Sequence, residues 1–157
     1  MKSLPQELRD YAVGLYRRLH QIPERGFDLP KTVAEVKKEL DAMGIPYTEA
    51  YGQCSLVGYL GHKENVPTLG LRADMDALPI GEQTDLPFAS KTPGVMHACG
   101  HDSHTAILLT VAKYLMPIRS MKPTDCRMTD SPEQDNSPSI CFSSNNCFTA
   151  VSSKQSI

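Results

Sequence analysis

The sequence changes character near Ile118, and this change limits how much of the chain can fold. Before that point, apolar residues recur at regular spacing, and Gly and Pro separate the periodic segments. From Ser120 to Ile157 the chain is rich in Ser, Asn, Pro and Thr and has no sustained apolar period. Such a stretch buries too little apolar surface to offset the entropy lost on ordering. We therefore expect an ordered domain over residues 1–118 and a disordered or frame-shifted tail over residues 119–157.

The ordered part predicts two helices, then short strands, then one more helix. Helical spacing of apolar residues indicates a first helix that ends near His20 and a second from about Pro30 to Gly44. The remaining expected elements are strands at about 47–50, 55–60 and 68–73, a long functional loop at 78–94 and a helix from Asp102. This order is typical of an α/β layered domain.

Two segments are apolar on more than one side. Leu69, Gly70 and Leu71 lie in the third expected strand, which predicts a central strand covered on both faces. Residues 106–115 are apolar nearly all round, which predicts a helix buried in the core of an intact domain.

Charge and hydropathy argue against two classes of partner. The net charge is −2 and the isoelectric point is about 6.2, so nothing favours nucleic acid or an anionic membrane surface. The most apolar run, residues 106–115, is interrupted by Lys113 and is too short to span a bilayer. No basic and then apolar leader opens the chain.

The cysteines indicate a reducing compartment. There are five, and their spacing is irregular. An odd number without a pattern argues against a disulfide framework and favours a cytoplasmic protein.

Four side chains that can bind a metal lie within eight positions: His97, Cys99, His101 and His104. Thiolate and imidazole are ligands that zinc accepts, as do manganese and cobalt to a lesser degree. Each residue also has a structural interpretation. Cys99 suits a small buried hydrophobe, His101 a helix-entry residue bonded to backbone, and Asp102 the N-cap of the last helix or a hydrogen-bond partner of a ligand. His97 and His104 are either pocket residues or polar groups satisfied within the fold.

Two carboxylates follow the third expected strand. Asp74 and Asp76 point the same way if the backbone is still extended. A carboxylate at the carboxyl end of a strand can hold a metal-bound imidazole by its second nitrogen. Capping of a turn is an equally good interpretation.

Three blocks of the sequence resemble the dinuclear-metal amidohydrolases of the aminoacylase, hippurate hydrolase and auxin-conjugate hydrolase group, a branch of the metallopeptidase family. The resemblance covers about residues 5–118, and its blocks are residues 17–27, 71–80 and 94–106. It implies the N-terminal part of an α/β/α layered, metallopeptidase-like catalytic domain. It also implies hydrolysis of N-acyl amino acids or related amides, two Zn, Mn or Co ions, and a homodimer.

The resemblance assigns roles to individual residues. Cys99 resembles the thiolate that lies between the two ions, and His101 resembles a terminal imidazole ligand. Asp76 resembles the aspartate that orients the metal site. Asp74 stands where more distant relatives place a ligand histidine, so it is grouped with His97, Asp102 and His104 as a candidate pocket residue.

The chain departs from the family pattern downstream. A strand that ends in Gln-Pro-x-Glu-Glu, which supplies the general base and a metal ligand, does not occur, and no histidine follows His104. The smaller inserted domain that mediates dimerisation is also missing. The alternative is therefore a truncated, inactive fragment that binds at most one metal ion weakly, at Cys99 and His101.

Overall fold

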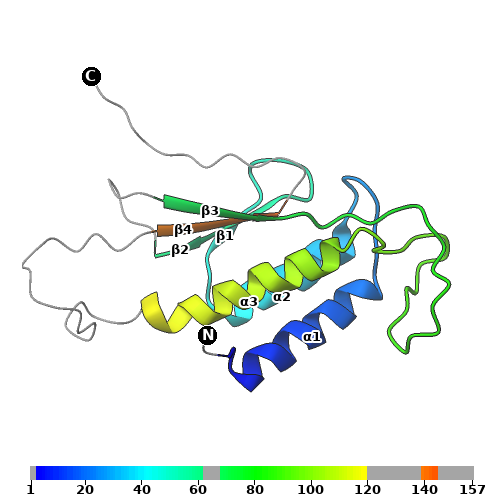
Figure 1. Cartoon of the computed structure of the whole chain (residues 1–157). Helices are drawn as coiled ribbons and strands as arrows, with labels where there is room; N and C mark the ends of the chain where they lie inside the picture. Colours follow the sequence, from blue (N-terminus) through cyan, green and yellow to red (C-terminus); the bar gives the residue numbers. More distant parts are fainter. Residues whose placement is uncertain (1–2, 62–67, 120–138, 145–157) are drawn as a thin grey trace, which may run out of the picture.

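Three helices lie on one side of a four-stranded sheet in this computed structural model, which describes residues 3–61, 68–119 and 139–144, and α1 is the helix farthest from the sheet (Figure 1). The elements are α1 (Gln6–His20), α2 (Pro30–Ala42), β1 (Tyr47–Thr48), β2 (Leu56–Leu60), β3 (Thr68–Ala73), α3 (His101–Arg119) and β4 (Ser139–Ser144). The α/β class and the expected order of elements up to α3 are confirmed.

The start of α2 is fixed by a side chain from the preceding loop. Its N-cap residue, Leu29, offers no capping side chain. The Glu24 carboxylate instead accepts hydrogen bonds from the backbone N–H groups of Lys31 at 3.1 Å and Thr32 at 2.8 Å. Two of the helix's free N–H groups are thereby satisfied, and the negative charge lies at the positive end of the helix dipole.

β3 is an edge strand of the sheet. The strand order is β1-β2-β4-β3, with β2 antiparallel to both β1 and β4, and β3 parallel to β4. The prediction that residues 69–71 form a central strand covered on both faces is therefore wrong for the described sheet. Leu69, near the start of β3, is 54% exposed.

The expected lack of regular structure in residues 119–157 does not hold at residues 139–144. These residues form β4, which pairs with β2 on one side and β3 on the other. Two neighbouring strands satisfy the backbone groups of this segment, and it contains the apolar run Ile140, Cys141 and Phe142. The average polarity of the whole tail conceals so short a run. The rest of the predicted tail, beyond Arg119, lies outside the described residues.

The core lies between the helices and the sheet, and it contains only one face of α3. The core cluster includes side chains of α1, α2 and β2, namely Leu15, Leu19, Val33, Val36, Leu40, Leu56 and Leu60. On α3, Ala106, Leu109 and Ala112 are buried, whereas Ile107 is 59% exposed and Tyr114 50% exposed. The prediction of a helix buried all round concerns an intact domain, and the described elements cover α3 on one side only.

Backbone pairing brings the three sequence blocks together at one end of the domain. The N–H of Ala77 donates to the carbonyl of Glu24 at 2.7 Å. Leu78 and Met96 exchange backbone hydrogen bonds of 3.0 and 3.1 Å. The segment after β3 therefore lies between the turn that follows α1 and the segment that precedes α3. The expected long loop between residues 78 and 94 forms the edge of this region.

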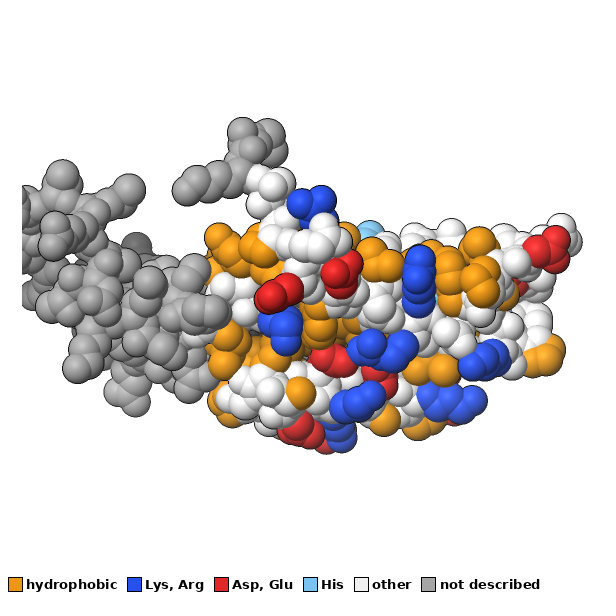
Figure 2. Space-filling model, turned by 90° about the horizontal axis from the view of Figure 1, so that it is seen from below, with side chains coloured by type: hydrophobic (Ala, Val, Ile, Leu, Met, Phe, Trp, Pro, Cys, Tyr) orange, Lys and Arg blue, Asp and Glu red, His pale blue; other side chains and the backbone are white. Residues whose placement is uncertain are grey.

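The helical side carries charges of both signs. Figure 2 shows Lys and Arg side chains interspersed with Asp, Glu and apolar side chains on the described part of this face. Arg18 of α1, for example, pairs with Glu35 and Glu39 of α2. Within the described residues, no helix has the length and hydropathy needed to cross a membrane.

A buried ion cluster ties the end of α1 to the long loop and to α3. His20 is 4% exposed, and its Nδ1 lies 2.6 Å from Oδ2 of Asp102 while its Nε2 lies 3.2 Å from Oε1 of Glu82. Glu82 also accepts hydrogen bonds from the Ser90 N–H at 2.5 Å and from the Thr84 hydroxyl. Since both ring nitrogens face carboxylates, both donate, and the imidazole carries a positive charge.

We expect truncation of Leu19 to destabilise the fold far more than truncation of Val13 on the same helix. Leu19 is fully buried and Val13 is 46% exposed. Leu19→Ala should lower the free energy of unfolding by about 2–5 kcal/mol, because it removes buried methyl groups and leaves a cavity. Val13→Ala should change it by less than about 0.5 kcal/mol. Urea unfolding followed by circular dichroism measures both, and equal effects would contradict the packing of α1.

The His20 cluster should make stability depend on pH in a defined direction. Burial alone would lower the pKa of His20, but its hydrogen bonds to Asp102 and Glu82 outweigh this and raise it above the ordinary value. The contribution of His20 is then fully present below the unfolded-state pKa of about 6.5 and is lost as the pH rises through the higher folded-state pKa.

The measurement compares the free energy of unfolding of the native chain and His20→Asn between about pH 6 and pH 9. The native chain should be more stable at the lower pH, and this advantage should shrink as the pH rises. A difference that stays constant with pH would show that His20 is not charged in the folded state.

Candidate metal centre

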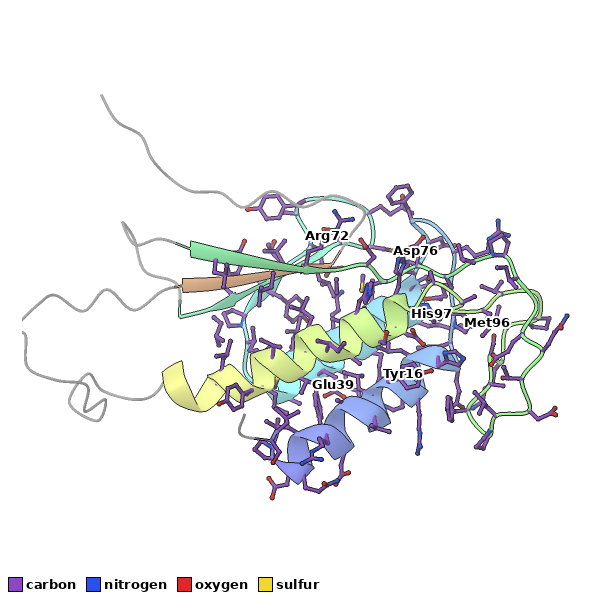
Figure 3. All side chains as sticks on the ribbon, in the orientation of Figure 1. Tyr16, Glu39, Arg72, Asp76, Met96 and His97 are labelled. Carbon is purple, nitrogen blue, oxygen red and sulfur yellow. The ribbon has the colours of Figure 1, made fainter. Side chains whose placement is uncertain are left out.

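The candidate ligands come from two segments that meet at the carboxyl end of β3. Asp74 and Asp76 follow this strand directly, and Cys99 and His101 bracket the start of α3. Gly100 between them has φ +85°, a conformation that favours glycine. Figure 3 shows Asp76 between the end of β3 and the first turn of α3, with His97 close by.

The central contact of the site joins Asp76 to His101. Nδ1 of His101 lies 2.9 Å from Oδ1 of Asp76 and 3.1 Å from its carbonyl oxygen. Both oxygens are acceptors, so Nδ1 carries a hydrogen, and Nε2 is the ring nitrogen left for a ligand. A carboxylate that fixes the tautomer and orientation of an imidazole in this way is typical of metal sites. The side chains are 25% and 22% exposed, so solvent reaches them.

Cys99 contacts the same aspartate. Its thiol lies 3.7 Å from the carbonyl oxygen of Asp76, and it is free and half-buried. Cys99 and His101 therefore both contact Asp76, although they are separated by a turn.

Asp74, His101 and His104 form a second group of potential ligands. One ligand atom from each lies within 4.8 Å of the others. Cys99 is not part of this set. Oδ1 of Asp74 also binds the Arg72 guanidinium, with Nε at 3.0 Å, and the Asp74 carbonyl accepts a hydrogen bond of 2.9 Å from the Thr105 hydroxyl.

His97 lies behind these residues and is not satisfied as a polar group. It is 3% exposed, and among the described residues neither ring nitrogen has a hydrogen-bond partner. Burial lowers the pKa of His97, which favours a neutral ring. Its ring centre is 6.5 Å from that of His20, and Asp102, His20, His101 and the Asp76 backbone all influence its pKa, so it lies between the buried cluster and the candidate ligands.

Asp102 does not cap α3 as one interpretation expected. The helix begins one residue earlier, at His101. One carboxylate oxygen of Asp102 lies 2.6 Å from His20, and the other accepts the Ser103 N–H at 2.8 Å. Asp102 therefore links α3 to the end of α1.

Sequence reasoning missed His20, Glu24 and Glu82. His20 and Glu24 lie in a segment that Pro23 and Gly26 mark as a helix end followed by a loop. Because that structural interpretation was sufficient, neither residue was given a chemical role. Glu82 lies in the long loop without any pattern around it. The signal for His20 and Glu24 was their membership in the first block of the resemblance.

Comparison with known proteins gives consistent matches. Residues 70–132 match the model of peptidase family M20/M25/M40. The chain is 46% identical over 110 residues to IAA-amino acid hydrolase ILR1-like 5 of Arabidopsis thaliana, covering 70% of this chain and 25% of that protein. It is 48% identical over 117 residues to the hippurate hydrolase of Campylobacter jejuni, covering 73% of this chain and 30% of that protein.

A solved structure extends the match to the fold. The YXEP protein of Bacillus subtilis, described as a dinuclear metal binding peptidase from the M20 family, aligns with a TM-score of 0.73 at 31% identity. The alignment covers 88% of this chain and 35% of that protein. The present chain spans about a quarter to a third of the length of the curated relatives described above. The chain thus matches peptidase family M20/M25/M40 in sequence over residues 70–132, and it matches the fold of an M20 peptidase over 88% of its own length.

Proposed function

We propose that this chain supplies one half of the metal centre of an amidohydrolase that releases amino acids from N-acyl amino acids or similar small amides. The observation that carries the proposal is the Asp76–His101 contact, with the Cys99 thiol at the carbonyl of the same aspartate. The donor set supports it, since an oriented imidazole and a thiol are ligands that zinc accepts.

Each of the chain's own residues would have a separate role at such a centre. His101 would bind through Nε2, Cys99 would bind as thiolate, and Asp76 would hold the imidazole in position. A bound divalent ion polarises the amide carbonyl and lowers the pKa of a bound water. His97, neutral and without a hydrogen-bond partner among the described residues, borders this region and is available to donate to a substrate oxygen.

The relatives' names support the substrate class, because they include an IAA-amino acid hydrolase and a hippurate hydrolase. Zinc, manganese or cobalt suits the donors, and a reducing, cytoplasmic setting suits the free thiols of Cys54 and Cys99. A homodimer is part of the proposal through the family resemblance.

A chimera tests the proposal directly. Residues 5–118 of this chain would replace the matching segment of the C. jejuni hippurate hydrolase, to which the chain is 48% identical. We expect metal-dependent hydrolysis of hippurate by the chimera. Cys99→Ala and His101→Ala should each reduce it about 100-fold or more, because several kcal/mol of transition-state stabilisation depend on the ion.

Glu7→Gln provides the matched control, since this charged side chain is exposed near the start of α1, at the opposite end of that helix from His20. The control should keep the activity of the chimera. A folded, metal-loaded chimera without activity would refute the proposal.

The 157-residue chain alone should not hydrolyse N-acetyl amino acids. The sequence contains no Gln-Pro-x-Glu-Glu block, and no His follows His104, so the general base and the later ligands of the resemblance are not supplied. Release of free amino acid by the purified chain, with the Cys99→Ala variant inactive, would contradict this expectation.

A further inference from the structure

We propose that residues 79–95 form a strap that opens away from α1, about the Leu78–Met96 pair, when the contact between Glu82 and His20 is lost. The strap is the long loop described above, and Figure 1 shows it beyond the C-terminal end of α1. The charge of His20 is the switch between the closed and the open strap. Neither Cys99 nor His101 takes part, so the strap is independent of the metal centre.

The strap has a hinge at its base. Leu78 and Met96 exchange two backbone hydrogen bonds, so the two ends of the strap leave the domain side by side. Residues 78–96, all of which the structure describes, are each exposed or half-buried. A segment with so little buried surface opens locally at a lower free energy than the core. The strap can therefore open while the helices and the sheet stay packed.

An ion pair and weaker contacts hold the strap on the end of α1. Oε1 of Glu82 lies 3.2 Å from Nε2 of His20, and the two side chains are 5% and 4% exposed. The Phe88 ring meets the His20 ring edge-on at 5.7 Å, and the Lys91 N–H donates to the carbonyl of Gln21 at 3.0 Å. A buried hydrogen bond between charged groups contributes more than either of these neutral contacts. Loss of the Glu82 contact should therefore release the strap.

Glu82 also connects the two halves of the strap. Its carboxylate accepts hydrogen bonds from the Thr84 hydroxyl and from the Ser90 N–H, the latter at 2.5 Å. The Ser90 hydroxyl in turn donates to the carbonyl of Val95 at 2.7 Å. These internal bonds run from the beginning of the strap to its end, so the strap should move as one unit.

Groups from three segments and from its own helix surround the charge of His20. The titratable groups that face it are Asp102 of α3, Glu82 of the strap, His97 of the segment before α3 and Tyr16 of α1. The Arg17 guanidinium lies 5.2 Å from the centre of the Phe88 ring. Burial lowers the pKa of His20, but its hydrogen bonds to the two carboxylates outweigh this and raise it.

Loss of one proton from His20 breaks the contact to the strap rather than the contact to α3. A neutral imidazole has a single N–H. Nδ1 lies 2.6 Å from Asp102, closer than Nε2 lies to Glu82, so the hydrogen stays on Nδ1. The lone pair of Nε2 then faces the Glu82 carboxylate, which is repulsive. The strap is therefore closed below the raised pKa of His20 and opens as the pH rises through it.

Hydrogen exchange of the purified chain between about pH 6 and pH 9 tests the strap. Protection of residues 82–92 is followed by mass spectrometry, with rates corrected for the intrinsic pH dependence of exchange, and residues 8–19 of α1 are the internal reference. We expect the protection of the strap to fall about 10-fold or more relative to the reference, because a hydrogen bond between charged groups is lost.

Three variants identify the group that acts as the switch. Glu82→Gln removes the charge from the strap, so its protection should be low at both pH values. Phe88→Ala removes a neutral contact, so it should lower the protection at every pH and keep the pH dependence. Asp85→Asn, the matched control, changes an exposed acid on the same strap and should keep the native profile.

The proposal is overturned if the protection of the strap relative to α1 does not change with pH in the native chain. It is also overturned if residues 8–19 lose protection together with the strap, since the two would then open as one unit. A pH dependence that persists in Glu82→Gln would show that another group is the switch. The native pH series needs no variant, so the test does not depend on how well a variant folds.

Discussion

The charged ring of His20 is the constraint on which the placement of the site depends. Asp102 at the start of α3 and Glu82 in the long loop are both buried, with side chains 1% and 5% exposed. Two buried carboxylates brought together without a cation would each retain a desolvation cost of several kcal/mol. His20, from the end of α1, lies between them and satisfies both. Because Asp102 is adjacent to His101, the same contact fixes the residue at which α3 begins.

Features set by local sequence could be predicted, and features set by distant partners could not. Helices α1 and α2 and strand β3 were expected close to their observed bounds, because periodic apolar residues and Gly or Pro mark them. Asp74, Asp76 and His101 were expected at one site since each is next to the end of an element. The partners of His20 are 82 and 62 positions away, and no local pattern connects them.

Burial was the property most poorly predicted, because it depends on what lies on the far side of an element. Leu69 and Ile107 are in an apolar strand and an apolar helix, yet both are more than half exposed. Their sequences are those of elements covered on both sides. The other described residues pack against these elements on one side only. The apolar pattern therefore indicates more extensive packing than the described residues provide.

The two sets of potential ligands are Cys99 with His101, and Asp74 with His101 and His104. They differ in the chemical change that each needs before an ion can bind. The Cys99 thiol points its hydrogen at the Asp76 carbonyl, and only a deprotonated thiolate is a metal ligand. Nδ1 of His101 is bound to Asp76, so Nε2 is the nitrogen left for an ion, and the Asp74 carboxylate has an oxygen that its contact with Arg72 does not use. Asp76 orients the one residue that both sets share. An ion at His101 is therefore held by Cys99 only once the thiol has lost its proton, and the contact of both residues with Asp76 keeps the thiol near His101.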